Sequence, residues 1–335
     1  MRIVSRVFLS VLFGLACVSG AEAAKPRHWA LAVHGGAGVI ERKSLSPEME
    51  AQYRAGIQAA LAAGSKVLES GGSSVDAVEA TLRVLEDDPN FNAGKGAVFT
   101  AEGRNELDAS IMDGATRKAG AIAGVTHTKN PISLARAVME HSPHVMLAGP
   151  GADEFSRAQG LEQVDPSYFR TERRWRELEE WRKDHTAVID PAHRFGTVGA
   201  VALDRNGHLA AGTSTGGTTG KRWGRVGDSP VIGAGTYAAD GNCAVSATGT
   251  GEYFIRAGAA RQVCDRVLWN RESIQSAADA TIANIGSIGG DGGLIAMDAA
   301  GRIAFAMNTP GMYRGWVTSE LPATTAIYAE ESGPK

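Results

Sequence analysis

The sequence predicts an α+β fold in which antiparallel sheets are covered by helices. Predicted strands and helices are segregated along the chain more than they alternate, which disfavours a doubly wound parallel sheet. Two stretches, 197–215 and 294–308, have the pattern of β-hairpins with a glycine in the turn. The 42 glycines gather in short clusters beside the predicted strands, where they allow tight turns and close backbone contacts.

The N-terminal half begins with an apolar strand, Trp29–Val33, that runs into His34-Gly-Gly-Ala-Gly38. Glycines in such a run let the backbone pass close to another segment. Ser73 or Ser74 is expected to cap a helix that carries Asp76 in its first turn. The other elements predicted in this half are helices at 48–63, 75–86 and 131–140 and strands at 106–112, 118–126 and 145–147.

The composition changes over residues 155–195, which are polar, charged and tryptophan-bearing and show no clean period. After this stretch, which we expect to be irregular, the β pattern returns. The elements predicted there are the hairpin 197–215, a strand at 243–247, helices at 251–269 and 274–285, and the hairpin 294–308. Neither half has enough sheet to close a core alone, so one structural domain is expected.

The turn Asp204-Arg-Asn-Gly207 sets the register of the first hairpin. A type I turn that ends in a left-handed glycine gives a three-residue loop, so Asp204 faces His208 and Thr197 faces Thr215. A two-residue loop would place Thr197 opposite Gly216 and turn Thr215 to the other face of the sheet.

Composition and charge describe an ordinary globular protein. The chain has 335 residues, of which 43% are hydrophobic and 21% charged, with a net charge of −3. The near-neutral charge and the lack of a basic stripe disfavour nucleic acid or an anionic membrane surface as the main partner.

The first two dozen residues have the pattern of a secretory signal peptide. Two arginines precede the apolar run 7–18, and Ala21-Glu-Ala-Ala24 follows it, so we expect a signal over residues 1–24 and a periplasmic or secreted protein. The apolar run is too short for a permanent membrane span, and no membrane association is expected once the signal is removed. Removal leaves Cys243 and Cys264, which are compatible with one disulfide or with two buried free thiols.

Thr197 is the first candidate catalytic residue, although a threonine at the start of a strand usually has only a structural role. The irregular stretch before it could present a cleavage site, and Gly196 gives an unhindered backbone there. Polar clusters follow it at 213–217, 224–228 and 248–251.

The motifs resemble those of the isoaspartyl peptidase and plant-type L-asparaginase family over nearly the whole mature chain. The matching segments are 34–38, 91–99, 106–114, 196–201, 213–217, 224–230 and 246–252. The resemblance implies the four-layer αββα sandwich of N-terminal-nucleophile hydrolases. It further implies a precursor that cuts itself into an alpha subunit, 25–196, and a beta subunit, 197–335, and a dimer of these cleaved protomers.

Within this resemblance, Thr197 is the nucleophile, and cleavage of the Gly196–Thr197 bond frees its α-amino group. Such an amine has an ordinary pKa of about 8, so it can take the proton of the weakly nucleophilic hydroxyl. Thr215 would lie beside Thr197 and tune its hydroxyl or orient water, and Asn92 would act as a more distant partner.

The resemblance also assigns substrate contacts. Arg225 would hold the substrate α-carboxylate with its planar fork, and Asp228 would pair with the α-ammonium group. Thr248 and the N–H of Gly249 would form the oxyanion hole, and Gly251 would line the amino-group pocket. The substrate would then be a β-aspartyl amide, either an isoaspartyl dipeptide or L-asparagine, without a preference that the sequence reveals.

Members of this family carry a structural sodium ion and use no cofactor for catalysis. The corresponding carbonyl ligands in this chain are those of Leu85, Glu86, Asp88, Phe91, Ala93 and Lys95. The side chain of Lys95 brings a positive charge near this loop.

Two alternatives remain. A glycosylasparaginase has the same fold but usually carries Asp before its nucleophile and Asn in the second motif, where this chain has Gly196 and Gly217. A non-enzymatic periplasmic protein that binds aspartate-like ligands would keep Arg225 and Asp228 but would have no need for Gly196-Thr197 or for Thr248-Gly249.

Overall fold

The computed structural model describes residues 28–183 and 196–334. The predicted signal peptide and the segment directly before Gly196 lie outside these residues. The larger of two sheets contains β1 (Ala30–Gly38), β2 (Leu107–Asp113), β3 (Ala119–Val125), β4 (Met146–Ala148), β5 (Thr197–Leu203), β6 (Leu209–Thr215), β11 (Gly311–Thr318) and β12 (Thr324–Tyr328). Its eight strands lie in the order β12-β11-β1-β5-β6-β2-β3-β4.

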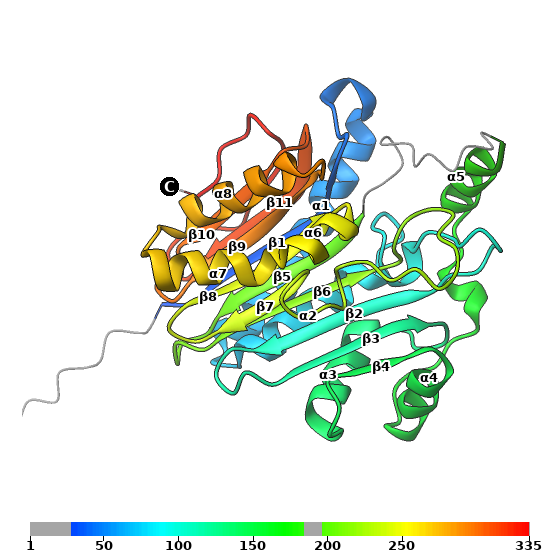
Figure 1. Cartoon of the computed structure of the whole chain (residues 1–335), viewed down its shortest axis with the longest axis horizontal. Coiled ribbons are helices and arrows are strands. Elements are labelled where there is room, and N and C mark those ends of the chain that lie inside the picture. The colour runs from blue at the N-terminus through cyan, green and yellow to red at the C-terminus, as the bar shows by residue number, and fades with distance from the viewer. Residues whose placement is uncertain (1–27, 184–195, 335) are drawn as a thin grey trace, which may run out of the picture.

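The smaller sheet lies against one face of the larger one (Figure 1). It contains β7 (Thr236–Ala239), β8 (Cys243–Gly249), β9 (Gly292–Asp298) and β10 (Ile303–Met307), in the order β10-β9-β8-β7. The neighbouring strands described in both sheets are antiparallel except β3 and β4, which are parallel. The predicted α+β class with antiparallel sheets is therefore confirmed.

Helices cover the outer faces of the two sheets (Figure 1). The larger sheet packs against α1 (Pro47–Glu69), α2 (Ser74–Asp87) and α3 (Pro131–His141), and the smaller one against α6 (Gly251–Ala257), α7 (Ala259–Asn270) and α8 (Ile274–Ser287). The remaining helices are α4 (Gly149–Ala158), α5 (Glu172–Lys183) and the 3₁₀ turns η1 (Arg42–Ser44), η2 (Gly94–Gly96) and η3 (Pro166–Phe169). Among the described residues, no helix combines the length and the apolar character that a membrane crossing requires.

The core has two layers, because side chains alternate along each strand. In β5, Val198 and Ala200 belong to the cluster under α1, α2 and α3, whereas Val201 and Leu203 belong to the cluster between the sheets. Thr197 shares the face of Val201. The predicted nucleophile therefore points into the space between the two sheets.

The hairpin register agrees with the three-residue turn. The Asp204 N–H donates to the His208 carbonyl at 3.0 Å, and the Gly207 N–H donates to the Asp204 carbonyl at 3.0 Å. Thr197 is paired with Thr215 across β5 and β6. The alternative register, with Gly216 opposite Thr197, is excluded.

Some predictions about the elements were wrong. The stretch 155–195 is not irregular throughout, because α5 forms there as a charged helix with Arg174 and Leu178 buried. Ion pairs at helical spacing, such as Arg173–Glu177 at 3.5 Å, take the place of a wide apolar stripe. The helix expected at 251–269 is divided at Gly258, whose φ of 58° ends one helix and begins the next. Strands β7, β11 and β12 were not predicted.

A disulfide joins Cys243 of β8 to Cys264 of α7. It attaches the helix layer to the smaller sheet, and it rules out the reading in which both cysteines are free thiols.

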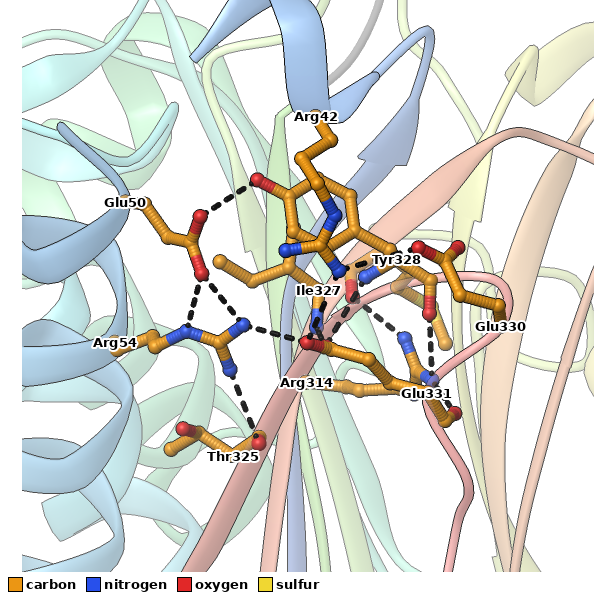
Figure 2. Close-up of polar contacts among 10 residues, drawn as sticks. Arg42, Glu50, Arg54, Arg314, Thr325, Ile327, Tyr328, Glu330 and Glu331 are labelled. Atoms are coloured by element: carbon orange, nitrogen blue, oxygen red, sulfur yellow. Dashed lines mark hydrogen bonds and ion pairs between the residues drawn. The ribbon is translucent and has the colours of Figure 1, made fainter. Parts of the chain in front are cut away.

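Strands from the two ends of the chain are interleaved in the larger sheet. β1 lies between β11 and β5, although both of these neighbours follow residue 196. The C-terminal segment is fastened to α1 in the same region, where Arg54 contacts both Glu50 (2.8 Å) and Glu331 (2.7 Å) (Figure 2). The Tyr328 hydroxyl donates to Glu50 at 2.8 Å.

Candidate active site

Thr197 and Thr215 are in hydrogen-bond contact at the start of β5 and the end of β6. The Thr197 hydroxyl donates to Thr215 Oγ1 at 3.1 Å, and only 9% of Thr197 is exposed. The Thr215 hydroxyl can in turn donate to the Gly196 carbonyl at 3.4 Å, while the Gly217 N–H donates to Thr215 Oγ1 at 3.0 Å. Thr215 therefore contacts both the candidate nucleophile and the carbonyl of the peptide bond before it.

The glycine segment of β1 passes directly over this peptide bond. A Cβ at Gly36 would lie 2.9 Å from the Gly196 Cα and 3.3 Å from the Thr197 nitrogen, and the Gly36 φ of 109° also favours glycine. The N–H of the next residue, Ala37, donates to Thr248 Oγ1 at 3.3 Å. One short segment thus links Thr197 with Thr248.

Thr248 and Gly249 end strand β8 beside this segment. Because Thr248 Oγ1 accepts from Ala37, the hydrogen of its fully buried hydroxyl remains available to donate. Gly249 has a φ of 155°, and a Cβ there would overlap the backbone of Asp291. A hydroxyl and a backbone N–H at such a site are suitable donors for a developing oxyanion.

Arg225 forms a two-point ion pair with Glu252. Its Nε donates to one carboxylate oxygen at 2.8 Å, and its Nη2 donates to the other at 2.9 Å. The Nε–Nη2 edge of Arg225 is therefore occupied by Glu252, and a substrate carboxylate would have to bind the other edge of the guanidinium, formed by Nη1 and Nη2. The arginine side chain is 20% exposed, so it can be reached from solvent.

Asp228 is a buried carboxyl group that lies against Gly251. A Cβ at Gly251 would be 2.9 Å from Asp228 Oδ1, so glycine keeps this space open. Burial raises the pKa of Asp228 to about 7, and nearby Arg225 opposes that shift. Its Oδ2 has no hydrogen-bond partner among the described residues. An unpartnered buried carboxylate is suited to hold a cationic ligand group.

Asn92 supports the site without a hydrogen bond to Thr197 in the described structure. Its Nδ2 donates to the Gly217 carbonyl at 2.7 Å, and its backbone carbonyl accepts from the Gly216 N–H at 3.1 Å. A Cβ at Gly196 would lie 2.5 Å from the Asn92 Cβ. A cavity of about 220 Å³ opens beside Gly196 and is lined in part by Asn92 and Arg173.

The carbonyls predicted to bind sodium lie in the last turn of α2 (Leu85 and Glu86), in the loop after it (Asp88, Phe91 and Ala93) and in η2 (Lys95). Pro89 has no N–H to donate to the Leu85 carbonyl, and the Asn90 N–H donates to Asp88 Oδ1 at 2.9 Å and not to the Glu86 carbonyl. The end of the helix therefore leaves these two carbonyls without their regular partners.

The other predicted cation ligands are arranged differently. The carbonyls of Asp88 and Ala93 accept from Phe91 (3.3 Å) and Gly96 (3.2 Å), and the Lys95 ammonium lies 5.4 Å from the centre of the Tyr168 ring. Within residues 28–183 and 196–334, no group of three His, Cys, Asp or Glu side chains is placed to hold a metal ion. A cation bound here would be held by backbone carbonyl oxygens, among them the two at the end of α2 that lack their regular partners.

The sequence did not identify several residues of the site. Asp108 lies directly opposite Thr215 on the neighbouring strand, is 1% exposed, and has an Oδ2 without a described partner. Glu252 was not identified as the partner of Arg225, although it directly follows the segment 248–251. The contact of His34 with the Thr197 carbonyl, at 3.1 Å, joins segments that are far apart in sequence. All three residues lie inside segments that match the family motifs, 34–38, 106–114 and 246–252, but the motifs gave them no role.

Comparisons with known proteins identify the family of this chain. A family model described as asparaginase matches residues 27–327. The chain is 48% identical over 309 residues to a protein named isoaspartyl peptidase from Escherichia coli, which covers 90% of this chain and 96% of that protein. It is 41% identical over 325 residues to a probable isoaspartyl peptidase/L-asparaginase 2 from Arabidopsis thaliana, with 90% and 99% covered. It is 43% identical over 295 residues to a plant-type L-asparaginase from Pyrococcus horikoshii, with 84% and 94% covered.

Proposed function

Because this chain belongs to the asparaginase family, we propose that it cuts itself before Thr197 and then hydrolyses β-aspartyl amides with Thr197 as an N-terminal nucleophile. The substrates proposed are isoaspartyl dipeptides and L-asparagine, the classes named in its relatives. The observation that carries the proposal is the placement of Thr215 between the Thr197 hydroxyl (3.1 Å) and the Gly196 carbonyl (3.4 Å).

Self-cleavage uses these three groups. The Thr197 oxygen attacks the Gly196 carbonyl carbon while its proton passes toward Thr215, whose hydroxyl polarises the carbonyl oxygen. The carbon–nitrogen bond breaks, the nitrogen takes up the proton, and an ester joins Gly196 to the Thr197 side chain. Water then hydrolyses the ester and leaves Thr197 with a free α-amino group.

Turnover repeats the chemistry on the substrate. The free amine takes the proton of the Thr197 hydroxyl as the oxygen attacks the side-chain amide carbon. Thr248 and the Gly249 N–H stabilise the oxyanion, and the leaving nitrogen receives the proton as its bond to carbon breaks. Water hydrolyses the resulting ester, which releases aspartate and regenerates the enzyme.

Substrate recognition depends on Arg225 and Asp228. The substrate α-carboxylate binds the Nη1–Nη2 edge of Arg225, while Glu252 holds the guanidinium through Nε and Nη2. The α-ammonium group pairs with the buried Asp228 beside Gly251. Together these contacts leave the side-chain amide directed toward Thr197.

The arrangement of two packed sheets between helices corresponds, in this proposal, to the four-layer αββα sandwich of N-terminal-nucleophile hydrolases. A structural sodium ion would bind carbonyls at the end of α2 and in the loop after it, and Leu85 and Glu86 offer the carbonyls best placed for it. The ion would fix this loop next to Asn92 and would take no part in the reaction. Adding sodium to chelated, desalted protein should raise its melting temperature. An unchanged melting temperature would show that no sodium ion binds the folded protein.

The protein is further proposed to act in the periplasm or outside the cell as a dimer of cleaved protomers. The N-terminal signal pattern supports the location, and so does the Cys243–Cys264 disulfide, because such bonds persist in oxidising compartments.

Parallel assays with β-aspartyl-leucine, L-asparagine and a glycosylated asparagine test the proposed activity. Release of leucine or ammonia, with little release of sugar, is expected. Preferential cleavage of the glycosylated substrate would instead identify a glycosylasparaginase. Binding of aspartate without any turnover would identify a binding protein.

A further inference from the structure

A second row of residues lies next to the Thr197–Thr215 pair, two positions into the sheet on each strand. The register places His34, Gly199, Thr213 and Ser110 side by side across β1, β5, β6 and β2. These residues face the smaller sheet, as Thr197 and Thr215 do, because side chains two apart on a strand share a face. Next to them, the smaller sheet presents Ser246 and its cross-strand partner Thr236.

The polar side chains of this row, together with Ser246 and Thr236 of the smaller sheet, form one continuous series of contacts, called the polar chain below. At one end, His34 Nδ1 lies 3.1 Å from the Thr197 carbonyl oxygen, and at the other the Ser110 hydroxyl donates to the Ser229 carbonyl at 2.6 Å. The links between them are His34 Nε2 to Ser246 (3.0 Å), Ser246 to Thr213 (2.7 Å), Thr213 to Thr236 (2.6 Å) and Thr236 to Ser110 (2.7 Å). The polar chain therefore runs from the nucleophile to the residue after Asp228.

Burying five polar side chains in a core costs free energy unless each of them is hydrogen-bonded. His34, Ser110, Thr213, Thr236 and Ser246 are all 0% exposed. A buried polar group without a partner costs about 1–3 kcal/mol, so each hydrogen in the polar chain has to be placed correctly. The pattern of donors can be worked out from the two ends.

Both ends of the polar chain are carbonyl oxygens, which only accept hydrogen bonds. At the Ser229 end, the Ser110 hydroxyl is the donor toward both the Ser229 carbonyl and Thr236 Oγ1, so the hydrogen of Thr236 is left for Thr213. From the Thr197 end, the hydrogen of the imidazole must be on Nδ1. Burial lowers the pKa of His34 to about 3, so the ring is neutral and Nε2 is left as an acceptor.

Ser246 is consequently the donor to Nε2. Thr213 can accept from Thr236, and its own hydrogen has two remaining acceptors, Ser246 Oγ and the Gly235 carbonyl at 3.1 Å. The donors can therefore run in one direction, from Ser110 toward His34, and the imidazole donates to the Thr197 carbonyl.

Gly199 makes the contact between the sheets possible. A Cβ at this position would overlap both Ser246 Oγ and His34 Nε2. The gap in the row lets the Ser246 hydroxyl from the smaller sheet reach the imidazole of the larger one. Gly199 directly follows the first two residues of β5, so the opening lies immediately below the nucleophile.

We propose that Ser246 and His34 are positioning residues for Thr197: the Ser246 hydroxyl holds His34 in the tautomer with its hydrogen on Nδ1, and His34 then fixes the Thr197 carbonyl. Fixing this carbonyl sets the orientation of the Thr197 backbone, and with it the directions of the hydroxyl and the α-amino group. The proposal rests on the proposed role of Thr197 as nucleophile. Neither residue touches the substrate.

The experiment combines a spectroscopic and a kinetic measurement on the full-length enzyme and on Ser246→Ala. Nitrogen-15 NMR of histidine-labelled protein, with His34 assigned by its absence in His34→Gln, reports which ring nitrogen carries the hydrogen. The wild type is expected to show the hydrogen on Nδ1 and a bare, hydrogen-bonded Nε2. In Ser246→Ala, Nε2 has lost its donor and only the Thr197 carbonyl still selects Nδ1, so the second tautomer should become detectable, and kcat should fall about ten- to a hundredfold with KM within about threefold.

A matched control removes an equally buried hydroxyl elsewhere. Thr281 is 0% exposed and donates only within α8, to the Ala277 carbonyl at 2.8 Å, so Thr281→Val should lower stability but leave the tautomer and kcat unchanged. A wild-type spectrum with the hydrogen on Nε2 overturns the proposal. So does a Ser246→Ala enzyme whose tautomer is unchanged, whatever its rate. If the wild type hydrolyses no β-aspartyl amide, the proposed function fails, while the spectrum still answers the question about Ser246 and His34.

Discussion

The hydroxyl of Thr197 donates to the hydroxyl of Thr215, its direct partner across β5 and β6, at 3.1 Å. A pair of hydroxyls at this distance next to a glycyl carbonyl is a geometry for proton transfer during acyl transfer.

Purified mature protein should run as two fragments on a denaturing gel, because Thr197 needs a free α-amino group to act as its own base. Edman sequencing of the C-terminal fragment should begin Thr-Val-Gly-Ala. Thr197→Ala should remain uncut and inactive. A fully active enzyme that stays a single intact chain contradicts the mechanism.

Thr215→Val should slow both self-cleavage and turnover by about a hundredfold or more, because it removes the group that accepts from Thr197 and reaches the Gly196 carbonyl. Valine keeps the shape of the side chain but leaves the Gly217 N–H without its acceptor, so the melting temperature should also fall. Thr215→Ser is the matched control, since it keeps the hydroxyl and should retain most of the activity. Equal rates in the valine variant and the wild type would remove Thr215 from the reaction.

Arg225→Lys should lower kcat/KM by about ten- to a hundredfold while self-cleavage proceeds normally, because cleavage involves no α-carboxylate. Lysine keeps the charge but cannot reproduce the bidentate contact that Arg225 makes with Glu252. Steady-state kinetics together with a gel of the cleaved subunits separates the two effects. Substrates with and without a free α-carboxylate should react equally if Arg225 lies outside the site.

The binding of L-aspartate should strengthen as the pH rises through about 7. Burial raises the pKa of Asp228 to about 7, so below that pH the carboxyl is neutral and cannot pair with the ligand ammonium group, whereas above it the carboxylate can. Titration calorimetry between pH 5 and 9 measures this dependence. Asp228→Asn should bind weakly and lose the pH dependence, and a flat wild-type profile would show that Asp228 does not titrate on binding.

Replacing both members of the disulfide, in Cys243→Ala/Cys264→Ala, should lower the free energy of unfolding by about 3 kcal/mol, as expected for a loop with a sequence separation of 21. Urea denaturation with and without a reducing agent provides the measurement. The reductant should destabilise the wild type and leave the double variant unchanged. A double variant as stable as the wild type would mean that the bond contributes nothing.

The hairpin and the main candidate residues could be predicted because their signals are local. The turn Asp204–Gly207 limited the hairpin to two registers, of which the structure has the three-residue one, and the glycine-rich motifs around Thr197, Arg225 and Thr248, which resemble those of a known family, are contiguous in sequence. The Ser73 cap is equally local, and its hydroxyl accepts from the Asp76 N–H at 3.1 Å. Each of these features depends on residues within one turn or one strand.

The other features depend on pairing between distant segments. Nothing in the sequence near Gly36 shows that it crosses the Gly196–Thr197 bond, and nothing near His34 shows that it contacts Ser246. Helix α5 was missed because ion pairs replace the apolar period by which helices are detected. Strand β11 was missed, although seven of its eight residues are buried in the structure, where it pairs with β1. Such long-range pairings leave no periodic signal in either partner.

If the chain is cleaved as proposed, the interleaved sheet makes refolding of the mature enzyme harder than folding of the precursor. After the Gly196–Thr197 bond is cut, β1 belongs to one polypeptide, while its neighbours β11 and β5 belong to the other. The native state keeps the fragments together through backbone hydrogen bonds on both edges of β1, but the denatured fragments are no longer tethered. Refolding of the mature enzyme is then a second-order reaction, and the midpoint of its unfolding transition depends on protein concentration. The precursor, in contrast, folds as a single chain. Cleavage thus makes unfolding hard to reverse under dilute conditions, so the mature protein depends on slow unfolding for its persistence.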